Sequence, residues 1–139
     1  MKNKVKIGIV GSRIYDNQQK VKDTVFKLKE KFGNELQIVS GGCEYGADKF
    51  AKKFALQFNC NYVEFTPAFR DKNRYSVQPM SYFNKPYHVS QFFHRNILLA
   101  EHVDYLFAFI PDGHDSPGTK HTMKIAKKHN TPITIINEK

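Results

Sequence analysis

The sequence contains no tryptophan, only two cysteines and eight glycines among its 139 residues, and no long apolar run. A membrane-spanning helix needs about 18 or more consecutive apolar residues, and no window of the chain approaches that length. Residues 1–4 lead into a strand-like pattern rather than into the apolar centre of a signal peptide. We therefore expect a cytoplasmic protein.

Cysteine and histidine are also too widely spaced to indicate a metal centre. Cys43 and Cys60 form no Cys-x-x-Cys pair, and no two of the six histidines are separated by four residues. Zinc sites and disulfide-stapled domains have closer and more regular spacings. We expect neither a metal site nor a disulfide.

Positive charge is what the chain has in excess. Its 22 Lys and Arg residues outnumber its 13 Asp and Glu residues, which gives a formal net charge of +9. Such a charge favours anionic partners, either nucleic acid or phosphorylated metabolites, and does not choose between them. Many of the lysines fall on predicted helices, where the solvated outer face is the ordinary interpretation.

Strand-like and helix-like patterns alternate along a length that suits a single domain, residues 1–139. Four amphipathic helices are predicted to begin near residues 17, 47, 90 and 119. The predicted strands are the apolar runs 4–10, 36–39, 61–65, 105–110 and 132–136. Right-handed crossovers convert this alternation into an α/β fold: a Rossmann-like, doubly wound, five-stranded parallel sheet of order 3-2-1-4-5 between two helical layers. Ligands bind such folds at the carboxyl ends of the strands, where the strand order reverses.

One connection has no regular pattern. Residues 67–89 mix three prolines with aromatic and basic side chains, and we predict a lid or an insertion within the single domain. In the helix that follows, the spacing predicts that Phe93, Ile97 and Ala100 face inward.

Small and hydroxyl-bearing residues follow three of the predicted strands, in segments 11–13, 40–42 and 116–119. Because the carboxyl ends of parallel strands meet at one edge of the sheet, we expect these segments to surround one pocket. Segment 116–119 opens the last helix and is the best phosphate candidate. The candidate ligand-binding residues are Gly11, Ser12, Arg13, Ser40, Gly41, Gly42, Asp48, Arg95, Asn96, Ser116, Pro117, Gly118 and Thr119.

Two of these candidates have an equally good alternative interpretation. Asp48 falls in the first turn of its helix, where it either satisfies the helix dipole or accepts a hydrogen bond from a ribose hydroxyl. Arg95 either clamps the ligand or forms a surface salt bridge. The chain has neither the P-loop pattern nor Gly-x-Gly-x-x-Gly, so ATP hydrolysis and ordinary dinucleotide-dependent dehydrogenation lose support.

Taken in order, four motifs resemble those of the YspA-like branch of the SLOG superfamily, which also contains DprA and the LOG-type cytokinin-activating phosphoribohydrolases. The motifs are Gly11-Ser12-Arg13 with Asp16, Ser40-Gly41-Gly42 followed by Gly46-Ala47-Asp48, Arg95-Asn96, and Ser116-Pro117-Gly118-Thr119. The resemblance implies a Rossmann-like domain that binds a nucleotide or a nucleotide-derived molecule, such as NAD or ADP-ribose, as a sensor or binding module. It also implies a homodimer.

The resemblance is incomplete where catalysis is concerned. LOG-type enzymes have a Pro-Gly-Gly-x-Gly-Thr-x-x-Glu motif, and Thr122 occupies the position of its glutamate here. If the protein is instead a nucleotide N-glycosidase, the candidate catalytic carboxylates are Asp16, Glu44 and Asp48. A second alternative is single-stranded nucleic-acid binding, with bases stacked on the aromatic-basic segment.

Overall fold

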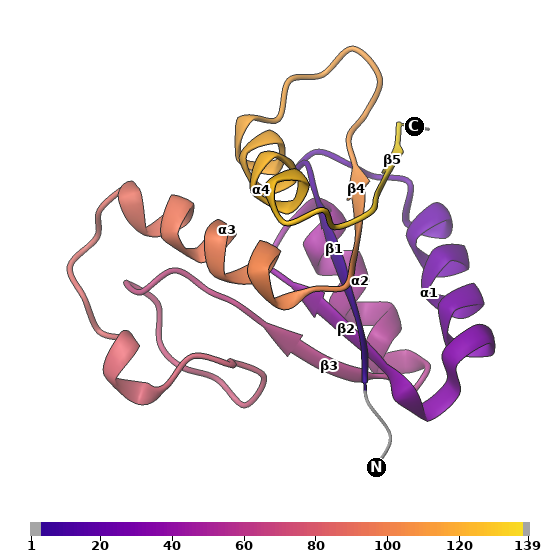
Figure 1. The fold of residues 1–139 in the computed structure, drawn as a ribbon, viewed down its shortest axis with the longest axis horizontal. Coiled ribbons are helices and arrows are strands. Elements are labelled where there is room, and N and C mark those ends of the chain that lie inside the picture. Colours follow the sequence, from indigo (N-terminus) through magenta and orange to yellow (C-terminus); the bar gives the residue numbers. More distant parts are fainter. Residues whose placement is uncertain (1–3, 138–139) are drawn as a thin grey trace.

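A five-stranded parallel sheet forms the middle layer of the protein, in a computed structural model that describes residues 4–137 (Figure 1). The strand order is β3-β2-β1-β4-β5, as predicted. The strands are β1 Val5–Gly11, β2 Leu36–Ser40, β3 Asn61–Glu64, β4 Tyr105–Phe109 and β5 Ile133–Ile136.

Helices cover the sheet on both faces, so the predicted three-layer α/β arrangement is confirmed. The helices α1 and α2 pack on one face, and α3 and α4 pack on the other (Figure 1). Their bounds are α1 Gln18–Phe32, α2 Gly46–Gln57, α3 Ser90–His102 and α4 Pro117–Lys128, with short 3-10 helices η1 Gly33–Glu35 and η2 Met80–Tyr82.

The central strand β1 is apolar because both of its faces are covered. Ile7 and Ile9 belong to the core beneath α1 and α2, whereas Val10 belongs to the opposite core with α3 and α4. Full burial of such a side chain contributes about 1.5–3 kcal/mol. Gly8 leaves room for the side chains of Leu106 and Val103, since a Cβ there would lie 2.8 Å from Leu106 Cδ1. The first motif therefore follows the most buried part of the sheet.

Local signals set the ends of α1. The Asn17 side chain caps the helix by accepting a hydrogen bond from the Lys20 amide at 3.1 Å. Gly33 ends it with φ +58°, a left-handed conformation that glycine adopts without strain. The start of α1 agrees with the predicted helix start near residue 17.

The predicted inward face of α3 is partly wrong. Ala100 is buried, but Phe93 is 45% exposed, and Asn96 and Leu99 are buried instead. Apolar spacing misplaced the stripe because Asn96 is a polar core residue, bonded to Arg95 and to the start of α4.

The irregular segment 67–89 folds back along β3. Its Ser76 forms a parallel bridge with Glu64, and the amide of Glu64 donates to the carbonyl of Tyr75 at 2.9 Å. Phe83 and Gln78 are buried, and the Gln78 amide donates to the carbonyl of Thr66 at 2.9 Å. The segment therefore covers the β3 edge of the sheet. A lid role for it stays a prediction.

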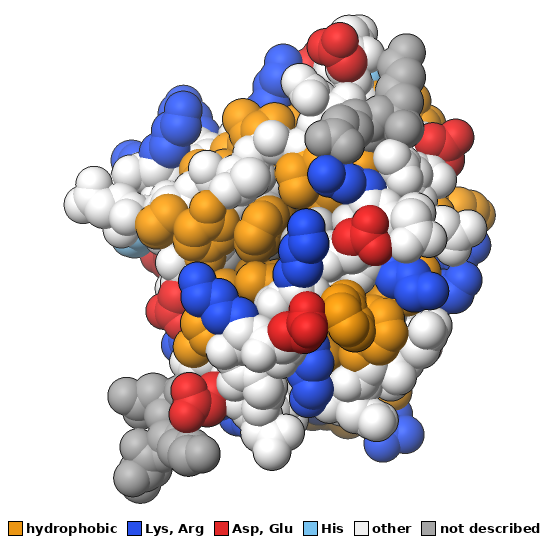
Figure 2. All heavy atoms as spheres, turned by 90° about the vertical axis from the view of Figure 1, so that its right-hand side faces the viewer, with side chains coloured by type: hydrophobic (Ala, Val, Ile, Leu, Met, Phe, Trp, Pro, Cys, Tyr) orange, Lys and Arg blue, Asp and Glu red, His pale blue; other side chains and the backbone are white. Residues whose placement is uncertain are grey.

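Apolar, basic and acidic side chains are interspersed on the face that carries α1 (Figure 2). Phe26 on this helix is 48% exposed, and it packs edge to face on Phe58. Basic side chains on this face lie among acidic and apolar ones rather than in a single basic surface. Within residues 4–137, no helix is long and apolar enough to cross a membrane.

Candidate functional site

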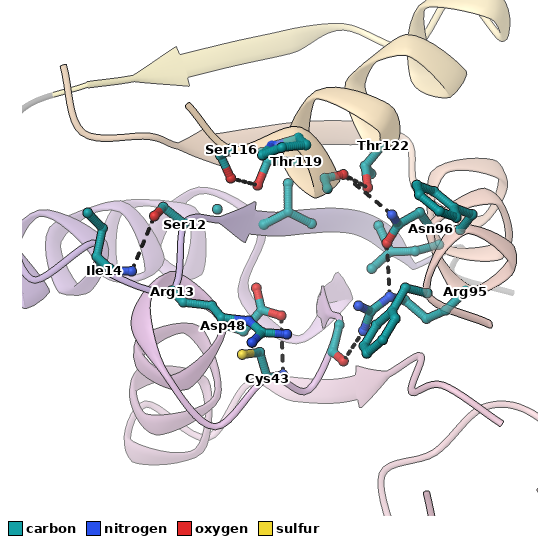
Figure 3. Close-up of a pocket in the computed structure, with 18 of the residues that line it drawn as sticks. Ser12, Arg13, Ile14, Cys43, Asp48, Arg95, Asn96, Ser116, Thr119 and Thr122 are labelled. Carbon is teal, nitrogen blue, oxygen red and sulfur yellow. Dashed lines mark hydrogen bonds between the residues drawn. The ribbon is translucent and has the colours of Figure 1, made fainter. Parts of the chain in front are cut away.

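A cleft of about 470 Å³ opens at the carboxyl edge of the sheet (Figure 3). It lies where β1 meets β2 and β4, between the loops that follow these strands and the side of α3. The candidate ligand-binding residues that line it are Gly11, Ser12, Arg13, Gly41, Asp48, Arg95, Asn96, Ser116, Pro117, Gly118 and Thr119. Ser40 and Gly42 do not line it. Their binding roles, like those of the lining residues, stay predictions.

Ser12 joins the loop after β1 to the start of α2. Its amide donates to the carbonyl of Phe109 at 3.0 Å, and its carbonyl accepts from Ala47 at 3.3 Å. Gly46 makes this contact possible because its φ is +69° and a Cβ there would lie 2.1 Å from the Ser12 carbonyl oxygen. The amide of Ala47, in the first turn of α2, is therefore bonded to the loop after β1.

Ser40 lies beneath the cleft in a buried polar network. Its hydroxyl is 2.7 Å from the Tyr62 hydroxyl, which donates to Glu64 at 2.7 Å. Burial is the main cause that raises the pKa of Tyr62, so this phenol remains a donor. The Ser40 hydroxyl also accepts from the Gly42 amide at 3.1 Å. This network holds the β2–α2 loop in place, which gives Ser40 and Gly42 a supporting position.

Asp48 projects from the first turn of α2 into the cleft (Figure 3). Only 8% of the residue is exposed, and its Oδ2 accepts the Cys43 amide at 3.2 Å. Burial raises the pKa of Asp48 to about 6, although the nearby Arg95 charge and the Cys43 amide lower it. A carboxyl group that titrates near neutrality in a cleft is typical of functional sites.

Arg95 is held by protein groups and connects α3 to two strand ends. Its Nη1 donates to the carbonyl of Gly41 at 2.5 Å and to that of Phe65 at 3.3 Å, and its Nε donates to Asn96 at 2.9 Å. Burial lowers the pKa of Arg95, Asp48 raises it, and the positive charge of Arg13 lowers it further. Arg95 thus helps to position the β2–α2 loop and forms no surface salt bridge among residues 4–137, and its role as a ligand clamp stays a prediction.

Asn96 continues this connection to the opposite side of the cleft. Its Nδ2 is 3.4 Å from the carbonyl of Gly118 and 3.4 Å from Nδ1 of His121. The neighbouring residues Arg95 and Asn96 therefore link the β2–α2 loop to the first turn of α4.

The amino end of α4 opens into the cleft without a side-chain cap. Pro117 stands in its first turn, and the hydroxyls of Ser116 and Thr119 are 2.8 Å apart. Amides at an uncapped helix start, together with the helix dipole, favour an anion. Arg13 reaches into the same cleft from the loop after β1 (Figure 3).

Several residues that line the cleft are not predicted by the sequence motifs. Apolar spacing predicts that Phe93 faces the core, and the sequence motifs do not include Ile14, Phe92 or His114, which also line the cleft. Ile14, an apolar residue directly after Arg13, is a signal that the sequence does offer. Cys43 also lines the cleft and is half-buried.

The candidate catalytic carboxylates are separated in space. Asp16 and Glu44 are exposed and do not line the cleft, and Glu44 lies 3.5 Å from Arg70. Asp48 lines it, as does the exposed Asp115. Among residues 4–137, no group of three or more His, Cys, Asp or Glu side chains is arranged to hold a metal ion.

No protein-family model matches the chain, and no curated protein matches it. Solved structures, in contrast, do match the chain. The chain superimposes on the molybdenum cofactor binding protein from the phototrophic bacterium Rippkaea orientalis with a TM-score of 0.74 and 16% identity, covering 100% of this chain and 80% of the other. It also superimposes on the molybdenum cofactor carrier protein of Chlamydomonas reinhardtii, with a TM-score of 0.66 and 18% identity, over 96% of this chain and 76% of the other. At these identities the likeness shows a shared fold.

Proposed function

We propose that the cleft binds a small phosphorylated ligand of the nucleotide class, as a binding module. The observation that carries this proposal is the uncapped start of α4 inside the cleft, opposite the guanidinium of Arg13. The phosphate accepts hydrogen bonds from the amides of Gly118 and Thr119, and Arg13 contributes its positive charge. The volume of about 470 Å³ is within the range of small-molecule sites.

Arg13 tests this proposal because it is exposed and makes no ion pair within the described part of the chain. Arg13→Ala is expected to weaken nucleotide binding by about 10-fold or more, the usual loss for one charge-assisted hydrogen bond. Isothermal titration with GMP, AMP, NAD and ADP-ribose measures it. Lys49→Ala, on the exposed side of α2, is the control. Absence of binding by the unmodified protein up to millimolar concentrations would contradict the proposal.

A second candidate ligand comes from the structural neighbours. Two proteins with this fold are described as binding or carrying the molybdenum cofactor. We infer that this cofactor belongs in the titration panel, although it is not a nucleotide. Co-purification of molybdenum with the protein, measured by mass spectrometry and lost in Arg13→Ala, is the expected result if this candidate is correct.

Nucleotide hydrolysis remains an alternative prediction. Of the three candidate carboxylates, Asp48 lines the cleft. Thr122, at the position of the glutamate in the LOG-type motif, also lines it. If the protein is an N-glycosidase, it releases free base from nucleoside monophosphates, and Asp48→Ala abolishes the release. The homodimer and the YspA-like relationship also stay predictions, and light scattering measures the first.

A further inference from the structure

A small basic hollow adjoins the cleft beside the β2–α2 loop. Three arginines, Arg13, Arg70 and Arg95, line this hollow together with the loop residues 41–43, and its volume is about 20 Å³. Arg13 and Arg95 also line the cleft, so the hollow is continuous with it. A space of this size holds one small group and not a ring.

The positive charges around the basic hollow have little compensation from the protein. Among the described residues 4–137, no Asp or Glu side chain lines it. The nearest acidic partner of Arg70 is Glu44 at 3.5 Å, and both side chains of this pair are largely in solvent, where an ion pair is weak. Asp48 lines the cleft but does not line the hollow.

Two of the three guanidiniums also act on each other. Arg13 and Arg95 point toward one another across the cleft (Figure 3). Burial is the main cause that lowers the pKa of Arg95, and the positive charge of Arg13 lowers it further. Like charges that converge on one space repel, and a bound anion relieves this repulsion. The arrangement therefore favours an anionic group in the hollow.

Aromatic rings support two of the arginines. The guanidinium of Arg70 lies 5.9 Å from the ring centroid of Phe69, and that of Arg95 lies 6.0 Å from the ring centroid of Phe92. The two rings pack edge to face, with centroids 5.4 Å apart. A guanidinium that rests on a ring keeps its N–H donors available for an anion. Nε and Nη1 of Arg95 donate to protein atoms, whereas Nη2 makes no hydrogen bond within residues 4–137.

We propose that the basic hollow binds a second phosphate group of a ligand whose first phosphate lies at the start of α4. A terminal phosphate carries up to two negative charges and three acceptor oxygens, which suits three guanidiniums better than a single carboxylate does. Arg13 lines both the cleft and the hollow, so it serves both phosphates. This inference rests on the proposed function and narrows the ligand to a nucleotide with two phosphate groups.

Titration calorimetry with singly and doubly phosphorylated nucleotides tests this assignment. The probes are AMP, ADP, adenosine 3′,5′-bisphosphate, GMP and GDP, with EDTA present so that no divalent cation neutralises the phosphates. At least one doubly phosphorylated probe is expected to bind about 10-fold more tightly than its monophosphate, the gain from one charge-assisted hydrogen bond. ADP and the bisphosphate distinguish adjacent phosphates from separated ones.

Arg70→Ala is expected to abolish this 10-fold advantage and to leave the affinity for AMP and GMP unchanged. Arg70 separates the two phosphate positions because it lines the hollow but not the cleft. Arg74→Ala is the matched control. It removes the same charge from the same segment, its guanidinium also lies over a ring, that of Tyr75 at 5.3 Å, and it lines neither space. Circular dichroism verifies that both variants are folded.

Three results would overturn the second phosphate position and leave the proposed function standing. They are equal affinity for the singly and doubly phosphorylated probes, an advantage that persists in Arg70→Ala, and an advantage that Arg74→Ala removes equally well. The last result would show that the overall positive charge is responsible. Absence of binding by every probe overturns the proposed function as well.

Discussion

The buried carboxyl of Asp48 makes the free energy of unfolding depend on pH. Its pKa rises from the ordinary 3.8 to about 6, mainly because burial disfavours the charged form. Between these two values the folded protein binds more protons at this site than the unfolded chain does. The stabilisation that the protonated Asp48 carboxyl contributes is therefore fully present below about pH 3.8, and it is lost as the pH rises through 6.

The expected loss is large compared with the stability of a small domain. The gap between 3.8 and about 6 is about 2 pKa units, and at 1.36 kcal/mol per unit it corresponds to about 3 kcal/mol by pH 7. The total free energy of unfolding of a typical domain is about 5–15 kcal/mol. Asp48→Asn removes this contribution, because the amide does not titrate and still accepts the Cys43 amide hydrogen bond.

Urea unfolding between pH 4 and pH 7.5 measures the effect. The difference in unfolding free energy between Asp48→Asn and the unmodified protein should shift by about 2 kcal/mol in favour of the variant across this range, since the unfolded carboxyl is already partly ionised at pH 4. Other titrating groups are common to both proteins and cancel. Parallel pH profiles for Asp48→Asn and the unmodified protein would refute the argument.

Three further predictions concern the scaffold and use urea unfolding at pH 7. Gly46→Ala should cost about 2 kcal/mol more than Gly33→Ala, because the Cβ added at Gly46 meets the Ser12 carbonyl oxygen, whereas Gly33 has open space around it. Both glycines have a positive φ, so equal costs would contradict the steric argument. Asn17→Ala should cost about 1 kcal/mol as the loss of the α1 cap, whereas no change would show that the cap contributes nothing. Arg95→Lys should cost about 1–3 kcal/mol because an ammonium cannot reach both carbonyls and Asn96 in the geometry of the guanidinium, and an unchanged stability would show that the charge alone matters.

The order of the strands followed from the sequence because it depends on local patterns and chain chirality. Continuous apolar runs mark strands that are buried on both faces, and short connections with right-handed crossovers leave few arrangements. The carboxyl edge was predictable for the same reason. Segments 11–13 and 116–119 follow neighbouring strands, so they had to meet there.

The tertiary structure decided which of the predicted side chains are available to a ligand. Ser40 and Arg95 have the residue types of binding groups, but their hydrogen bonds are made to protein atoms far away in the sequence. Asp48 became distinctive only through burial, which no local pattern reveals, because its surroundings come from β2, α2 and α3 together. The sequence alone determined where the cleft lies, since strand ends are local features. The packing of elements distant in the chain determined which groups face it, since burial and hydrogen-bond partners depend on contacts that no local segment contains.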